Sequence, residues 1–309
     1  MRIAVMGTGG LGGYLGGRLA HAGQDVTFIA RGQRLHAMRE NGLQIRSSDG
    51  DFTIKPVRAT DVPAEVGSVD LVLFCVKTYD AQRAAEMMRP LVGPQTAILP
   101  VLNGIEHLDM LSAGLDAEHV LGGMALVTVH STVPGIVERI GRINLLELGE
   151  VSGEVSARSQ TIEQIFIAAG IDAKAVPNIL ERMWWKFVIV CGAGVFAVVR
   201  GGKSVVWGTP ETRTLLLQTI TEALAVAHGQ HIPLSPTFVE EYISIVESLP
   251  SQWMPSLLVD LEQGRRLEVE ATNGFLSRLG KKLEIFTPAN DFLYACLKPY
   301  VNGRPPTDH

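Results

Sequence analysis

A glycine-rich segment near the start of the chain has the residue types and spacing that bind a dinucleotide. Gly7-Thr8-Gly9-Gly10-Leu11-Gly12 directly follows the strand-like run Arg2–Met6 and opens a helical pattern that continues toward Ala20. In a G-x-G-x-x-G of this kind, the first glycine permits a tight turn, the second lets the backbone approach a pyrophosphate, and the third allows close helix packing. The alternative, a turn that serves packing alone, is disfavoured by the preceding strand and the following helix.

A cation stands at the position where such sequences select their cofactor. The second strand-like run, Asp25–Ala30, is followed by Arg31, with Arg34 close behind. NAD-binding sequences usually place Asp or Glu there to hold the ribose diol, whereas a guanidinium can form two charge-assisted hydrogen bonds to a 2′-phosphate. The sequence therefore predicts NADPH rather than NADH as the cofactor. The alternative is that Arg31 is an ordinary exposed arginine.

Two polar residues follow the next strand-like runs. Lys77 comes directly after Val69–Val76, and Asn103 comes directly after Ala97–Leu102. Because open α/β sheets bind ligands just beyond the carboxyl ends of their strands, we expect both side chains to border the cofactor cleft. The alternatives are a loop cap or a solvated side chain.

Lys186 has the chemistry needed to reduce the carbonyl of a 2-oxo acid. Such a reduction needs a hydride donor, a group that neutralises the developing alkoxide and partners for the substrate carboxylate. An ammonium can polarise the carbonyl and then donate a proton. Lys186 lies at the start of an otherwise apolar helical run, where burying a cation is costly unless it faces a cleft or a partner. The alternative is a helix-end lysine whose ammonium reaches solvent.

The elements that position these residues change in type along the chain. In the first half, strand-like runs alternate with amphipathic helices, and the runs are apolar throughout, as in a parallel sheet covered on both faces. We expect three further strand-like runs to extend this sheet, partly by antiparallel pairing: Val120–Val129, Gly135–Ile140 and Ile143–Leu148. A helix at Ser156–Ala169 and a strand at Ile171–Val176 should close it.

After Pro177 the pattern is helical, and proline suits a helix start. The expected helices are Asn178 to about Val199, Pro210–Ala227, Pro236–Glu247, Gly264–Leu279 and Pro288–Val301. We therefore predict an α/β protein with an N-terminal Rossmann-like doubly wound sheet, residues 1–176, that binds NADPH. A second, all-helical C-terminal domain, residues 177–309, should carry the substrate and catalytic residues, with a loose tail from Asn302.

Composition and charge narrow the partners. The chain has 309 residues, 46% of them hydrophobic and 19% charged, which is typical of globular proteins. A formal net charge of -5 without a basic patch argues against nucleic acid or an anionic membrane as a partner. Cys75, Cys191 and Cys296 show no CxxC spacing, so neither a metal site nor a disulfide framework is predicted. Without a signal peptide or a spanning segment, we expect a cytoplasmic monomer or homodimer.

Several motifs together resemble the ketopantoate reductase family, in an order and spacing that extend over nearly the whole chain. They are GTGGLG, CVKTYD with Lys77, LNGIEH with Asn103, MWWK with Lys186, and LEVEATNGFLSRLGKKLEIFTPAN with Glu268 and Asn273. Members of that family reduce 2-dehydropantoate (ketopantoate) to pantoate with NADPH. The resemblance implies that Lys186 is the catalytic acid and Glu268 its acidic partner. It further implies that Asn103 binds cofactor and substrate, that Lys77 serves the cofactor, and that the substrate also contacts Ser256 and Asn273.

The chain departs from the family's pattern at two positions. Family members commonly carry asparagines four and eight residues after the catalytic lysine, where this chain has Val190 and Gly194. Those asparagines help to hold the substrate, so a different 2-oxo acid, with a less polar side chain, is one alternative substrate. Another alternative is a noncatalytic NADPH sensor, which has no need of both Lys186 and Glu268. For Glu268 alone, the alternative is a solvated helix carboxylate beside two arginines.

Overall fold

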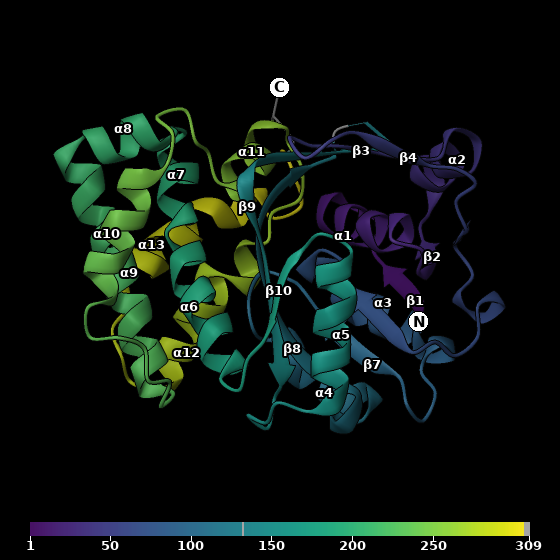
Figure 1. Ribbon diagram of the computed structural model, residues 1–309. Helices are drawn as coiled ribbons and strands as arrows, with labels where there is room; N and C mark the ends of the chain where they lie inside the picture. Colours follow the sequence, from purple (N-terminus) through teal and green to yellow (C-terminus); the bar gives the residue numbers. More distant parts are fainter. Residues whose placement is uncertain (132, 306–309) are drawn as a thin grey trace. The chain divides into compact units, whose positions relative to one another are not determined.

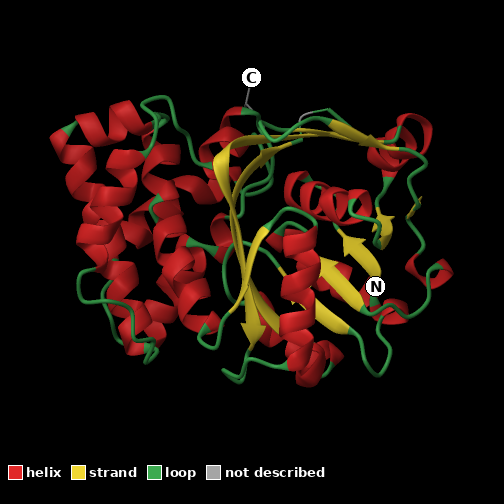
Figure 2. Ribbon diagram, in the orientation of Figure 1, coloured by secondary structure: helices red, strands yellow, loops and turns green. Residues whose placement is uncertain are grey.

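The computed structural model describes residues 1–131 and 133–305 and divides the chain into two compact units. Residues 1–102 and 107–182 form the first, here called the sheet unit; residues 103–106 and those from 183 onward form the second, the helical unit. Every strand of the described residues belongs to the sheet unit (Figures 1 and 2). The division falls inside a helix, after Arg182, rather than at Pro177 where the sequence suggested it.

The first sheet consists of five parallel strands in the order β5-β2-β1-β6-β7. Its strands are β1 (Arg2–Met6), β2 (Asp25–Ile29), β5 (Ala59–Thr60), β6 (Leu71–Phe74) and β7 (Ala97–Pro100). Strands β6 and β7 are buried along their whole length, which explains their continuous apolar sequences. The chain leaves β1 on one side toward β2 and returns on the other side at β6, so the carboxyl ends of β1 and β6 form the switch point where such sheets bind ligands.

A second sheet contains the strands that were expected to extend the first, so that expectation is wrong. Its strands are β3 (Leu43–Arg46), β4 (Phe52–Ile54), β8 (Leu121–His130), β9 (Ile136–Glu150) and β10 (Asp172–Ala175). They follow the order β10-β9-β3-β4, and β8 pairs with β9 in antiparallel fashion as expected. The two runs on either side of Gly141 are one strand of 15 residues, which is the long curved strand in Figure 2.

Helix α1 (Gly10–His21) explains why there are two sheets, because it packs against both of them. A Cβ on Gly16 would lie 2.6 Å from Cγ2 of Val5 in the first sheet, and one on Gly13 would lie 2.9 Å from Cγ2 of Val137 in the second. A Cβ on Gly12 would likewise approach Val5 of the first sheet, and one on Gly17 would approach Ile45 of the second. With glycines on both faces, the helix backbone approaches each sheet more closely than any larger residue allows.

The other helices of the sheet unit are α2 (Gly32–Asn41), α3 (Ala81–Met87), α4 (His107–Leu115) and α5 (Ala157–Ala168). Helix α5 begins where the sequence predicted, because Oγ of Ser156 accepts a hydrogen bond from the backbone N–H of Ser159 and caps it. Short 3-10 helices are η1 (Pro63–Glu65), η2 (Thr78–Asp80), η3 (Arg89–Leu91) and η4 (Ala117–His119).

The helical unit is built from the end of α6 and seven further helices within the described residues. They are α6 (Ile179–Cys191), α7 (Ala193–Val199), α8 (Lys203–Gly208), α9 (Pro210–Gly229), α10 (Phe238–Ser248), α11 (Ser256–Glu262), α12 (Asn273–Lys282) and α13 (Pro288–Leu297), with η5 (Val269–Ala271) and η6 (Lys298–Tyr300). Helices α8 and α11 were not predicted; each is short and lies within a stretch interrupted by Gly, Pro and Ser.

Two expected helices differ from the observed ones. The helix expected from Asn178 to Val199 is two helices, since Gly192 forms a tight turn between them and packs against Tyr242. The helix expected at Gly264–Leu279 begins only at Asn273, because Gly264 ends α11 with a φ of 65° that a helix does not tolerate. Glu268 therefore lies in a loop immediately before η5.

Candidate cofactor and substrate site

The glycine-rich loop leaves β1 at a residue that only glycine can occupy. Gly7 has a φ of 97°, and a Cβ there would lie 2.8 Å from the carbonyl carbon of Cys75, just beyond β6. The loop thus fits against the end of the neighbouring strand at the switch point of the first sheet. Lys77 follows at the start of η2, partly buried, so it lies at this same edge as the sequence suggested.

The residues of this loop fit a pyrophosphate. A Cβ on Gly9 would have only Nη1 of Arg34, at 3.6 Å, within contact distance, so the backbone is open to a close ligand. The N-terminus of α1 has no side-chain cap and no acidic residue in its first turn, which leaves N–H groups and positive potential for an anion. Arg34 is placed at this loop by a hydrogen bond of 2.6 Å from its Nη1 to the carbonyl oxygen of Thr8. Burial lowers the pKa of its guanidinium.

Arg31 is exposed at the N-cap position of α2, and it is engaged by a carboxylate. Its Nη2 lies 2.8 Å from Oδ2 of Asp80, the last residue of η2. Sequence reasoning missed Asp80, although it is part of the CVKTYD segment that contains Lys77. The only available signal was an acidic residue three positions after Lys77, which is equally typical of a helix start.

Asn103 and Glu268 are brought together within the helical unit. Nδ2 of Asn103 donates to Oε2 of Glu268 at 3.4 Å, and Glu268 is only 7% exposed. The alternative that Glu268 is a solvated helix carboxylate is therefore wrong. The loop of residues 103–106 is fixed at two more points: a Cβ on Gly104 would lie 2.7 Å from the carbonyl of Ala271, and Glu106 forms an ion pair with Arg278.

Lys186 lies in the middle of α6 rather than at a helix end. It is partly buried, and its neighbours Trp184, Phe187 and Val188 belong to the core. The residue is therefore not a helix-end lysine, and it is only partly covered by its surroundings.

The two remaining substrate candidates lie in different environments. Ser256 is exposed at the first position of α11. Asn273 is fully buried: its Nδ2 donates to the carbonyl of Cys191 and to Oδ1 of Asn290, both at 2.9 Å. Its Oδ1 has no hydrogen-bond partner and lies 2.8 Å from where a Cβ of Gly194 would be. The absence of a side chain at 194 is therefore what leaves room for this carboxamide.

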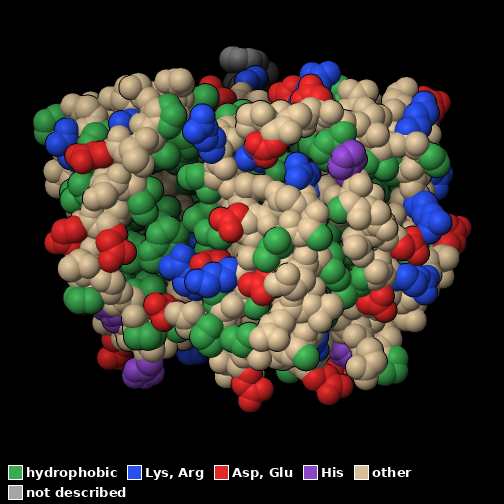
Figure 3. All heavy atoms as spheres, in the orientation of Figure 1, with side chains coloured by type: hydrophobic (Ala, Val, Ile, Leu, Met, Phe, Trp, Pro, Cys, Tyr) green, Lys and Arg blue, Asp and Glu red, His purple; other side chains and the backbone are tan. Residues whose placement is uncertain are grey.

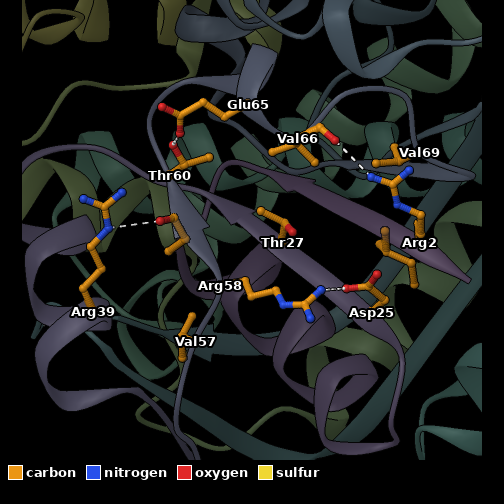
Figure 4. Close-up of a pocket in the computed structure, with 12 residues that line it drawn as sticks. Arg2, Asp25, Thr27, Arg39, Val57, Arg58, Thr60, Glu65, Val66 and Val69 are labelled. Carbon is orange, nitrogen blue, oxygen red and sulfur yellow. Dashed lines mark hydrogen bonds and ion pairs between the residues drawn. The ribbon is translucent and has the colours of Figure 1, made fainter.

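A hollow of about 450 Å³ lies elsewhere, at the beginning of β1 and β2 (Figure 4). Arginines from its wall donate to protein oxygens, as Arg2 does to the carbonyl of Val66 and Arg58 to the carboxylate of Asp25. Arg2 and Asp25 begin their strands, whereas Gly7 and Arg31 follow the ends of the same strands. None of the predicted site residues lines this hollow.

The surface carries charges of both signs, and one long apolar helical segment is mostly buried. Lys and Arg are interspersed with Asp and Glu over the face seen in Figure 3. The segment Ile179–Val199 has the length and composition of a membrane span, but in its 18-residue window of mean hydropathy 1.6, 56% is buried, as in a core helix. Among the described residues, no group of three or more His, Cys, Asp or Glu forms a candidate metal site.

Comparison with known proteins gives matches over nearly the full length. Two family models match, Ketopantoate reductase PanE/ApbA over residues 3–153 and Ketopantoate reductase PanE/ApbA C terminal over residues 178–301. The uncharacterized oxidoreductase YkpB of Bacillus subtilis is 29% identical, with 97% of this chain and 99% of the relative covered. The structure of 2-dehydropantoate 2-reductase from Geobacter metallireducens is 30% identical with a TM-score of 0.91, and the match covers 96% of this chain and 99% of that one. The structure of D-mandelate dehydrogenase in complex with NADH is 25% identical with a TM-score of 0.86, and the match covers 96% of this chain and 98% of that one.

Proposed function

Because this chain belongs to the ketopantoate reductase family, we propose that it reduces the carbonyl of 2-dehydropantoate with a hydride from NADPH, giving pantoate. The observation that carries the proposal is the contact between Asn103 and the buried carboxylate of Glu268. Within the helical unit, it brings an amide of the 103–106 loop to a carboxylate that is only 7% exposed.

The roles of the residues follow from their chemistry. When bound, the cofactor supplies the hydride; the backbone at Gly9 and the start of α1 hold its pyrophosphate, with Lys77 at the same edge. Nζ of Lys186 donates a hydrogen bond to the carbonyl oxygen of the substrate and then transfers its proton to the alkoxide. Glu268 serves as the acidic partner of that lysine, and Asn103 orients the carboxylate through its amide.

A different 2-oxo acid is the second candidate substrate, and one observation favours it. At Gly194 the chain lacks a side chain, and the space is taken by the carboxamide of Asn273. With Val190 also apolar, this part of the helical unit offers few groups to a substrate hydroxyl. A substrate with a plain alkyl or aromatic side chain is compatible with such a surface, and D-mandelate dehydrogenase is among the similar structures.

The proposal includes a cytoplasmic location and a monomeric or homodimeric state, without nucleic-acid or membrane partners. The part that concerns nucleic acid and membrane is supported by the interspersed surface charges and by the net charge of -5, which favour neither a polyanion nor an anionic bilayer.

The test of the proposed function is Lys186→Ala, assayed by NADPH oxidation with 2-dehydropantoate and with a series of other 2-oxo acids. Loss of a general acid should lower kcat by about 100-fold or more, while the Kd for NADPH stays within about twofold. The matched control is Lys281→Ala, which removes a lysine from the last turn of α12 and should leave kcat unchanged. Normal turnover by Lys186→Ala would refute the catalytic role. Tight NADPH binding with no 2-oxo acid reduced by the wild type would favour the noncatalytic sensor.

A further inference from the structure

The ion pair between Arg31 and Asp80 joins two loops at the cofactor edge of the first sheet. Arg31 follows β2 and Asp80 follows β6, and these two strands lie on either side of β1. Nη2 and Oδ2 are 2.8 Å apart, and the side chains are 57% and 31% exposed. A carboxylate is therefore present at the point where the sequence alone suggested only a cation.

Helix capping does not account for Asp80. It occupies the N-cap position of α3, where an aspartate ordinarily accepts a hydrogen bond from the first turn, yet no side-chain capping bond is formed. Its carboxylate is directed to the guanidinium of Arg31 instead. Exposed ion pairs of this kind contribute little to the stability of a fold.

The two members of the pair recognise different cofactors. A guanidinium binds a 2′-phosphate through two charge-assisted hydrogen bonds. A carboxylate is what NAD-binding Rossmann folds use to accept hydrogen bonds from the ribose hydroxyls. Toward a 2′-phosphate the same carboxylate is unfavourable, because it repels the anion and occupies part of the guanidinium.

We propose that Asp80 sets the balance between the two cofactors, an inference that rests on the proposed function. Its carboxylate makes NADH usable by accepting hydrogen bonds from the ribose hydroxyls, and it weakens NADPH by competing for Arg31. The chain accordingly binds both cofactors, and its preference for NADPH is smaller than Arg31 alone would give. NADH use is thus determined by the loop after β6, not by the end of β2 where the dinucleotide motif places its acidic residue.

The test is calorimetric titration of NADPH and NADH, which differ only in the 2′-phosphate, into the wild type and Asp80→Asn. Asparagine has the same shape and is an equally good N-cap residue, so the fold should be unaffected. Removing the charge should lower the Kd for NADPH about tenfold and raise the Kd for NADH about threefold. Asp80→Ser, a second capping residue, should shift both values in the same directions, and melting temperatures of both variants verify that they are folded.

The matched control is Asp25→Asn, which removes the carboxylate of another exposed ion pair, that with Arg58, at the opposite end of β2 (Figure 4). It should leave both Kd values unchanged. If the wild type binds both cofactors but Asp80→Asn leaves their ratio unaltered, or if Asp25→Asn alters it equally, the inference fails while the proposed function stands. If the wild type binds neither cofactor, the proposed function fails, and the inference fails with it.

Discussion

The missing side chain at Gly194 determines which group fills this part of the helical unit. Asn273 is held in place by two hydrogen bonds of its Nδ2, and its unpartnered Oδ1 faces Gly194. An asparagine at 194 would therefore have to displace a fully buried carboxamide. Val190 already carries a side chain and is partly buried in α6. Of the two departures from the family's pattern, the one at 190 is the more readily reversed.

We expect Val190→Asn to raise the preference for 2-dehydropantoate over 2-oxoisovalerate, its analogue without the hydroxymethyl group. A polar group that loses its partner on binding is costly, so an added amide should discriminate against the analogue, whereas the apolar wall of the wild type does so weakly. The measurement is kcat/KM for both substrates. Val190→Ala, which adds no hydrogen-bonding group, is the control. A wild type that already prefers 2-dehydropantoate by several orders of magnitude would mean that other residues supply the contacts.

Glu150 provides a prediction about pH. Arg158, through hydrogen bonds of 2.8 and 2.6 Å, holds the pKa of this carboxyl below its ordinary value of 4.5; burial opposes the shift and Ser156 supports it. Because the pKa in the folded state is lower than in the unfolded state, the stabilisation is complete above pH 4.5 and is lost as the pH falls through the folded-state pKa.

Glu150→Gln should therefore lower the free energy of unfolding by about 1–3 kcal/mol at pH 7, and the difference from the wild type should shrink below pH 4.5. Urea unfolding at a series of pH values measures it. Glu138 lies on the same strand as Glu150 and forms an exposed ion pair with Arg46 of β3, so Glu138→Gln should change stability by less than about 1 kcal/mol. A difference for Glu150→Gln that does not vary with pH would contradict the prediction.

Among the elements, α1 depends most on its surroundings. It contains five glycines in 12 residues, yet it is helical because two sheets pack against it. Gly16→Ala should destabilise the protein by about 1–3 kcal/mol, since the new methyl group would lie 2.6 Å from Cγ2 of Val5 and 2.7 Å from Cε1 of Phe28. Gly114→Ala in α4, where nothing lies within 4 Å, should instead stabilise by up to about 1 kcal/mol. Thermal unfolding of the two variants measures the difference. Equal changes in melting temperature for Gly16→Ala and Gly114→Ala would show that packing at Gly16 is loose.

The sequence predicted those elements whose local pattern agrees with their final environment. Strands β1, β2, β6 and β7 are apolar runs in a covered parallel sheet, and their positions were predicted to within two residues. Strands β3 and β4 were missed because they are short and partly exposed, so they show no continuous apolar signal. The second sheet itself was missed because β9 pairs with β3, whose residues come about 90 positions earlier, and with β10 after it, which no local pattern encodes.

At the scale of the whole molecule, the α/β class with a helical C-terminal region and the family were predictable, because motifs distributed over the chain each keep their local context. The candidate site was only partly predictable from the sequence. The glycine-rich loop and Lys77 follow strand ends, which sequence reveals. The burial of Glu268 was not foreseen, since its contact with Asn103 joins residues 165 positions apart. Asp80 was missed because an acidic residue before a helix is ordinarily a cap.

The glycine content of α1 has a consequence for the order of folding. Each glycine costs a helix about 1 kcal/mol relative to alanine, so this segment cannot remain helical on its own and must wait for its partners. One of those partners, Val137, enters the chain more than a hundred residues later. In pulse-labelled hydrogen exchange during refolding, the amides of α1 should therefore gain protection after those of α5, and earlier protection of α1 would contradict this. Since the glycine-rich loop that we propose to hold the cofactor leads into α1, we expect a nascent chain to bind a cofactor only once β9 has been synthesised and has folded.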